Sequence, residues 1–298
     1  MTFCPSLPMP ENPSRFTLPA VPAVLLSIVS VQGGAAIAKG LFPVLGPLGT
    51  TSLRIGLSAL LLLVLVRPRL GRLTAAQWRA VVPYGLALGL MNLLFYCALA
   101  RIPLGLTVTV EFLGPLALAL AGSRRWLDVG WALLAGAGIA LITPWHGAGL
   151  DLLGLVFALA AGASWAVYIV LGHRTAAVLP GPQAVAIGML FAALPVLPFG
   201  LMGGALGQLT PHLLLLGALV ALFSSVLTFS LEMHALRTLP PRTFSILMSL
   251  EPAAAAVSGW LLLGERLLPA QWLAVGFIVV ASLGATRSRP ATEAVAGA

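Results

Sequence analysis

The stretch LARIPLGLTVTVEFLGPLALALAG (99–122) aligns without a gap to LRTLPPRTFSILMSLEPAAAAVSG (236–259). Pro115 in the first copy falls on Pro252 in the second, and each copy has a glutamate within four residues of that proline. An apolar sequence that repeats at nearly half the chain length indicates a duplicated membrane protein whose site lies between the halves. The repeat therefore predicts the architecture of a membrane transporter.

The composition of the chain excludes an ordinary soluble domain. The 298 residues have a mean hydropathy of +1.04, and only 8% of them are charged, against about a quarter in soluble domains. Apolar stretches of about 20 residues, long enough to cross a membrane, fill nearly the whole chain. The net charge of +8 comes mostly from arginines between apolar segments. Because aromatic residues do not alternate with them, we expect no nucleic-acid partner.

Turn residues and charges divide the chain into ten candidate membrane helices. We therefore expect an all-α membrane protein with ten transmembrane helices, in which prolines interrupt the segment 182–202. The expected helices are 20–42, 48–66, 78–100, 103–122, 127–145, 150–171, 182–202, 212–236, 242–263 and 268–286. The expected divisions are a disordered cytoplasmic tail at 1–19, five-helix repeats at 20–145 and 150–286, and a cytoplasmic tail at 287–298.

The distribution of arginines predicts the orientation of the chain. If both termini are cytoplasmic, the outer flanks hold only Arg101 and Arg266. This bias agrees with the positive-inside rule. Each half has an odd number of helices, so the second half enters the membrane upside down and the two repeats are inverted. The inner flanks then hold Arg15, Arg67, Arg69, Arg72, Arg79, Arg124, Arg125, Arg174, Arg237, Arg242, Arg287 and Arg289.

Five charged residues remain inside the expected spans. A charge in hydrocarbon costs about 2.5–3.5 kcal/mol on insertion scales, so each is expected to face the interior of the bundle or a water-filled cavity. Lys39, the only lysine, is either a substrate-binding residue or a side chain that reaches the outer headgroups. Arg54 is either a substrate-binding residue or a structural one, paired with a carbonyl or a glutamate. The five residues are Lys39, Arg54, Glu111, Glu232 and Glu251.

Glu111 and Glu251 are the strongest candidates for binding and proton coupling, because each lies near the middle of its span. Pro115 has no N–H for the carbonyl of residue 111, and Pro252 likewise frees the carbonyl of Met248. We therefore expect helices 103–122 and 242–263 to bend beside their glutamates. A free carbonyl and a carboxylate together suit an ammonium group or a proton. The alternative is a buried carboxyl that is hydrogen-bonded to a neighbouring helix.

Polar and aromatic residues on three other helices complete the candidate substrate site. For the aromatic residues, core packing or an interfacial belt is the alternative. The polar and aromatic candidates together are Gln32, Asn92, Tyr96, Trp165 and Tyr168. The chain has no Walker-type loop, HExxH, paired CxxC or nucleophile elbow, so we expect no catalytic residue, no metal site and no enzyme activity.

Several longer runs make the chain resemble a known family. Ten helices in two inverted halves, with a proline centred in the fourth and ninth, are similar to the drug/metabolite transporter superfamily and its EamA domains. Within that superfamily the chain resembles the bacterial inner-membrane threonine/homoserine exporters. The runs are SVQGGAAIAKGLFP (30–43), MNLLFY (91–96), PLGLTVTVEFLGPLA (103–117), SLEMHALRTLPPRTF (230–244) and LMSLEPAAAAVSG (247–259).

The resemblance implies export of small amino acids across the bacterial inner membrane, driven by proton exchange and without another cofactor. A zwitterion needs a cation for its carboxylate, which Lys39 or Arg54 would supply. It needs an anion for its ammonium, which Glu111 and Glu251 would supply. Two alternatives stay open: export of other amphipathic metabolites or cationic drugs, and a non-transporting membrane scaffold. The expected partners are the substrate, protons and membrane lipid, and the sequence does not predict the oligomeric state.

Overall fold

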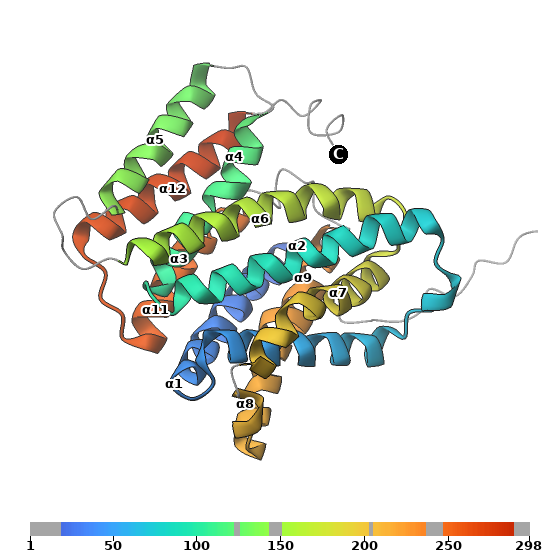
Figure 1. Ribbon diagram of the computed structural model, residues 1–298. Helices are drawn as coiled ribbons and strands as arrows, with labels where there is room; N and C mark the ends of the chain where they lie inside the picture. The colour runs from blue at the N-terminus through green and yellow to red at the C-terminus, as the bar shows by residue number, and fades with distance from the viewer. Residues whose placement is uncertain (1–18, 122–125, 143–150, 203–204, 237–246, 289–298) are drawn as a thin grey trace, which may run out of the picture.

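The computed structural model describes residues 19–121, 126–142, 151–202, 205–236 and 247–288, and every element in these ranges is helical (Figure 1). The short elements η1 and η2 are 3-10 helices, and η3 is a π-helix. The expected terminal tails lie almost wholly outside the described residues. The elements are α1 (Ala20–Val66), η1 (Leu70–Arg72), α2 (Ala75–Leu99), α3 (Leu104–Glu111), α4 (Leu113–Ala121), α5 (Trp126–Ile142), α6 (Leu152–Ala176), α7 (Gly181–Met202), η2 (Ala205–Gln208), α8 (Pro211–Ala221), η3 (Leu222–Leu227), α9 (Thr228–Leu236), α11 (Glu251–Leu263) and α12 (Pro269–Ser288).

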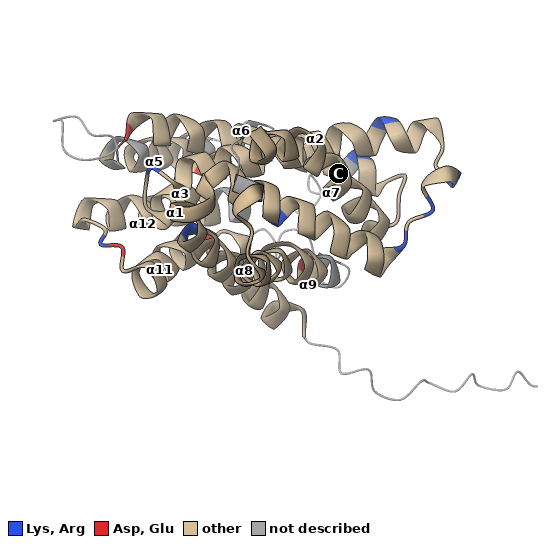
Figure 2. Cartoon of the chain, turned by 60° about the horizontal axis from the view of Figure 1, so that its bottom comes forward, with Lys and Arg blue, Asp and Glu red and all other residues tan. Residues whose placement is uncertain are grey.

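Five of the described helical stretches are long and apolar enough to cross a membrane. They are α1, α2, α6, α7 and the run Pro211–Glu232. Shorter apolar helices lie at Leu104–Leu118, Val129–Gly138, Glu251–Leu263 and Pro269–Gly284. Figure 2 shows that charged residues are sparse over the bundle and that basic residues gather around the connection from α1 to α2. The structure thus has the all-helical, membrane-spanning character that the sequence predicts.

Helix α1 bends sharply inside its 47-residue length. The bend is at Gly46, whose φ of +65° is left-handed and suits a residue without a Cβ. Pro43 and Pro47 flank it, and neither has an N–H to continue the helical hydrogen bonds. Figure 1 shows the two resulting arms, a first arm at 20–45 and a second arm at 47–66. These arms correspond to the expected helices 20–42 and 48–66.

Two other segments differ in detail from the expected helices. Helix α7 is continuous through Pro195 and Pro198, so the expected interruption is wrong. The expected helix 212–236 is regular at both ends but contains the π-helical turn η3. Nothing in the sequence indicated this wider turn.

Helix α2 lies between α6 and α7. A Cβ at Gly85 would lie 2.5 Å from the carbonyl oxygen of Gly188, and one at Gly89 equally close to that of Ala192. Small residues let membrane helices approach closely in this way. Residue numbers rise together along both helices, so α2 and α7 run parallel.

The contact of α2 with α6 is antiparallel. The Thr175 hydroxyl donates to the carbonyl of Ala80 at 3.1 Å. The rings of Tyr84 and Tyr168 stack with centroids 5.0 Å apart, and their hydroxyls are 3.2 Å apart. Later residues of α2 therefore contact earlier residues of α6.

Helix α3 runs antiparallel to α11. A Cβ at Gly105 would lie 2.5 Å from the Cα of Ala256, and a Cβ at Gly259 would contact the Cβ of Leu104. Helices α5 and α12 are also antiparallel, because their residues pack in reverse order from one end to the other. In Figure 1 this second pair lies beside α4, at the opposite side of the bundle from the second arm of α1.

Candidate functional site

Arg54, on the second arm of α1, is a buried cation inside the bundle. Its side chain is only 6% exposed. One terminal nitrogen, Nη1, donates to Asn92 Oδ1 at 2.7 Å and to the Tyr96 hydroxyl at 3.3 Å. The other, Nη2, donates to the Ser224 carbonyl at 3.1 Å. Arg54 therefore connects the second arm with α2 and η3, and it brings three predicted site residues together.

The two partners on α2 are held in fixed orientations. Asn92 Nδ2 donates to the carbonyl of Leu88 at 2.8 Å, so its oxygen faces Arg54. The guanidinium carbon of Arg54 lies 5.4 Å from the centroid of the Tyr96 ring, in cation–π range. Tyr96 is fully buried and also packs against the ring of Phe42. Asn92 and Tyr96, one helical turn apart on α2, thus both face Arg54.

Glu111 and Glu251 both lie at helix breaks, and each is 6% exposed. Glu111 ends α3, one residue before the turn at Phe112 that separates α3 from α4. Glu251 begins α11, after a turn at residues 249–250. A carbonyl inside the membrane that loses its N–H donor to a proline needs another neighbour. The carbonyl of Glu111 lies against Gly162 of α6, so closely that a Cβ at Gly162 would collide with it.

Glu111 and Glu251 lie within electrostatic reach of each other and of the half-buried Glu232. Glu251 interacts with both Glu111 and Glu232, and Glu111 interacts with Arg54. In the described part of the chain, none of these three carboxyls accepts a hydrogen bond. Two buried carboxyls, a half-buried third and one guanidinium thus lie in an apolar bundle, where charged side chains are rare.

Lys39, on the first arm of α1, forms an ion pair with Glu265. Its Nζ lies 2.6 Å from Oε1 of Glu265, and Oε2 of Glu265 accepts the N–H of Leu104 at 2.8 Å. This ion pair ties the first arm to the start of α3 and to the segment between α11 and α12. Glu265 was not among the residues predicted from the sequence. The signal was available, because the expected topology places Lys39 and Glu265 on the same side of the membrane and the chain has only eight acidic residues.

The remaining predicted residues divide between two places. Trp165 of α6 packs edge-to-face on Phe112, the residue that follows Glu111, with ring centroids 5.6 Å apart. Tyr168 instead stacks on Tyr84, in the packing contact between α2 and α6. Gln32 is 3% exposed on the first arm and makes no hydrogen bond within the described residues.

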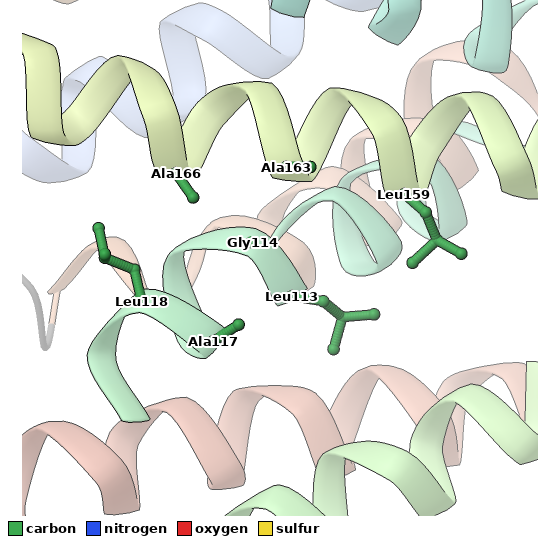
Figure 3. A pocket seen from close by; sticks show the side chains of 7 residues that line it. All are labelled: Leu113, Gly114, Ala117, Leu118, Leu159, Ala163 and Ala166. Carbon is green, nitrogen blue, oxygen red and sulfur yellow. The ribbon is translucent and has the colours of Figure 1, made fainter. Parts of the chain in front are cut away.

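The structure also has an apolar groove of about 520 Å³ between α4 and α6 (Figure 3). None of the predicted polar site residues lines it. Its lining residues are Leu113, Gly114, Ala117, Leu118, Leu159, Ala163 and Ala166. A zwitterion would find no charged partner there, so the groove is not the candidate site.

The chain is similar to known membrane transporters in sequence and to a solved structure in fold. Residues 152–287 match the family described as EamA-like transporter family. The chain is 46% identical to the threonine/homoserine exporter RhtA of Escherichia coli (strain K12) over 265 residues, which covers 88% of this chain and 90% of that protein. The exporter of the same name from Salmonella typhimurium (strain SL1344) is 46% identical over 267 residues, again 88% of this chain and 90% of that protein. A solved crystal structure with 21% identity aligns with a TM-score of 0.58 over 89% of this chain and 96% of that one, so the two share a fold.

Proposed function

Because the chain belongs to the EamA-like transporter family, we propose that it is a secondary active exporter of small amino acids such as threonine and homoserine. The observation that carries the proposal is the 46% identity, over 88% of this chain, to proteins named as threonine/homoserine exporters. We place it in the bacterial inner membrane, because the similar exporters are bacterial, and the arginine distribution supports cytoplasmic termini.

Helix packing supports a ten-span architecture of two inverted five-helix repeats. In this scheme the two arms of α1 are the first two spans, and the run Pro211–Glu232 belongs to the eighth. Spans four and nine are then the antiparallel neighbours α3 and α11, and spans five and ten are the antiparallel neighbours α5 and α12. The packing of α6 on α2 is matched by that of the first arm on η3 and α9, as a two-fold relation between the halves requires.

Arg54 is the residue that fits the substrate carboxylate best. Its Nε has no partner in the described part of the chain, although the guanidinium is buried. Lys39 already has a carboxylate partner in Glu265. A guanidinium also matches the planar geometry of a carboxylate better than an ammonium does. In this scheme Lys39 therefore lies at one end of the substrate pathway, and Arg54 binds the carboxylate at its centre.

Glu111 and Glu251 are the groups that bind the ammonium, and one of them also binds the coupling proton. A carboxylate holds an ammonium or a proton but not both at full strength, so a proton that enters from outside promotes release of the substrate there. Rocking of one repeat against the other exposes this central site to each side in turn. The helix breaks beside Glu111 and Glu251 would let this movement change the positions of the two carboxyls.

Exchange measurements on reconstituted protein test this scheme. We expect Glu111→Gln and Glu251→Gln to slow the exchange of labelled threonine at least tenfold, whereas Glu232→Gln, which removes a half-buried carboxyl nearer the expected cytoplasmic end, slows it less. If both central variants exchange threonine like the parent, the coupling role is wrong. A growth assay with toxic homoserine and a panel of cationic dyes separates amino-acid export from drug export. A scaffold would protect cells against neither.

A further inference from the structure

Unpartnered buried polar atoms concentrate at one crossing in the described part of the chain. Four side-chain atoms there are buried and lack a hydrogen-bond partner. Two lie on the second arm of α1 and two on η3, and these segments pack against each other. Buried polar groups normally have partners, so such a group calls for an explanation. The atoms are Arg54 Nε, Ser58 Oγ, Ser224 Oγ and Ser225 Oγ.

The π-helical turn that carries two of these serines is held in place by other hydroxyls. Both Ser30 Oγ, at 2.8 Å, and Thr228 Oγ1, at 2.7 Å, donate to the Phe223 carbonyl. The Phe223 carbonyl in this turn thus has two hydrogen-bond donors, whereas the hydroxyls of Ser224 and Ser225 have no hydrogen-bond partner. Turns of this kind are rare in helices and are frequent at functional sites.

Two of the three serines are linked to Arg54, one through its backbone and one through its place on α1. The carbonyl of Ser224 accepts from Arg54 Nη2, and its side chain packs so closely on Gly34 that a Cβ at Gly34 would collide with it. Ser58 follows Arg54 by one helical turn and so shares its face of α1. All three serines are at most 2% exposed. Ser225 follows Ser224 in η3, so the three serines and the cation lie on two neighbouring segments inside the bundle.

We propose that Ser58, Ser224 and Ser225 bind the side-chain hydroxyl of the transported amino acid while Arg54 holds its carboxylate. This inference rests on the proposed function and adds the residues that select the substrate. Threonine and homoserine carry their hydroxyls on different carbons, and three donors around one cation can serve either position. A site that hydrogen-bonds a substrate hydroxyl discriminates against an analogue that lacks it, because its own polar groups are then left without partners.

Valine is the matched probe, because it has the shape of threonine with a methyl group in place of the hydroxyl. Vesicles containing the full chain are loaded with labelled threonine or labelled valine, and the ratio of the two initial export rates is measured. In the triple variant Ser58→Ala/Ser224→Ala/Ser225→Ala we expect this ratio to fall by about three- to tenfold, as the loss of a hydrogen bond implies. We expect valine export and Tm to stay unchanged, because no hydrogen bond within the protein is lost.

The control variant is Ser27→Ala. Ser27 is equally buried, but its hydroxyl already donates to the carbonyl of Val24 at 2.8 Å. Its ratio of threonine to valine export should equal that of the parent. The inference is overturned, while the proposed function stands, if the triple variant keeps the parental ratio or if the parent exports valine as fast as threonine. Loss of both fluxes together, or a lower Tm in the triple variant, would show that the serines are structural and would also overturn it. If the parent exports neither amino acid, the proposed function fails as well.

Discussion

A buried guanidinium requires several partners, and the surroundings of Arg54 supply most but not all of them. Its terminal nitrogens donate hydrogen bonds to Asn92, Tyr96 and the carbonyl of Ser224, whereas Nε has no hydrogen-bond partner in the described residues. Arg54 therefore joins three elements and still offers a donor to a carboxylate. At the scale of single residues, the same side chain holds the helices together and supplies the positive charge of the candidate site.

Replacing Arg54 tests whether it anchors the substrate. Lysine keeps the charge but loses the fork of donors, so we expect Arg54→Lys to raise the threonine concentration for half-maximal transport at least tenfold. Tyr96→Phe removes only a 3.3 Å bond and keeps the ring, so its effect should be about threefold or less. Rates of uptake into inverted vesicles over a range of threonine concentrations measure both values.

Lys39→Gln is the matched comparison, because it removes the other candidate cation. Its charge is already paired with Glu265, so threonine affinity should change less than in Arg54→Lys. A larger loss of affinity in Lys39→Gln than in Arg54→Lys would reverse the assignment of the carboxylate anchor.

Asp151, just before α6, predicts a pH dependence outside the membrane-spanning segments. Its Oδ2 accepts a 2.6 Å hydrogen bond from Arg101, and this bond, together with backbone N–H groups, lowers the pKa of Asp151. A lowered pKa in the folded state contributes stability above the unfolded value of about 3.9, and that stability is lost as the pH falls through the folded pKa. We expect the Tm of the parent to fall relative to that of Asp151→Asn between about pH 5 and pH 3. A Tm difference that does not change over this range would contradict the assignment.

The bends that place the site are properties of whole elements. Gly46 divides α1 into its two arms, and residues 112 and 249–250 separate the helical halves beside Glu111 and Glu251. Each break lies within four residues of a proline, which explains its position. If the helices were straight at these positions, the charged side chains would point in different directions.

Gly46→Ala tests the most pronounced bend. With φ of +65° and ψ of 172°, Gly46 lies in a region that essentially only glycine adopts. An alanine there costs about 1–3 kcal/mol, so the free energy of unfolding should fall by about that amount. Nothing lies within 4 Å of a Cβ at Gly46 or at Gly40, so steric clashes contribute in neither variant. Gly40→Ala, in a regular part of the first arm, should leave stability unchanged or raise it slightly. Equilibrium unfolding in detergent measures both, and equal stabilities of the two variants would contradict the role of the bend.

Elements were predictable from the sequence where local signals decide them. Apolar length located the helices, and Pro115 indicated the break beside Glu111. The π-helical turn was not predictable, because one of the hydroxyls that holds it belongs to Ser30, 193 residues away in the chain. The continuity of α7 through Pro195 and Pro198 was also missed, since packing against α2 and the second arm outweighs the two lost hydrogen bonds.

The arrangement of the whole molecule decides which candidate residues meet. Sequence patterns selected Arg54, Asn92 and Tyr96 separately, and only the packing of the second arm on α2 joins them. The partnership of Lys39 with Glu265 depends likewise on the approach of the first arm to the segment after α11. Charge patterns thus indicate which residues lie inside a bundle, whereas their partners follow from helix packing across the whole chain.

Export of threonine by the purified protein tests the central claim most directly. The full chain is reconstituted into vesicles loaded with labelled threonine, and efflux is followed with and without an acidic external medium. We predict efflux at least tenfold faster than from protein-free vesicles, and faster again when the outside is acidic, because entering protons displace the ammonium from its carboxylate. Efflux equal to that of protein-free vesicles under both conditions would contradict the account.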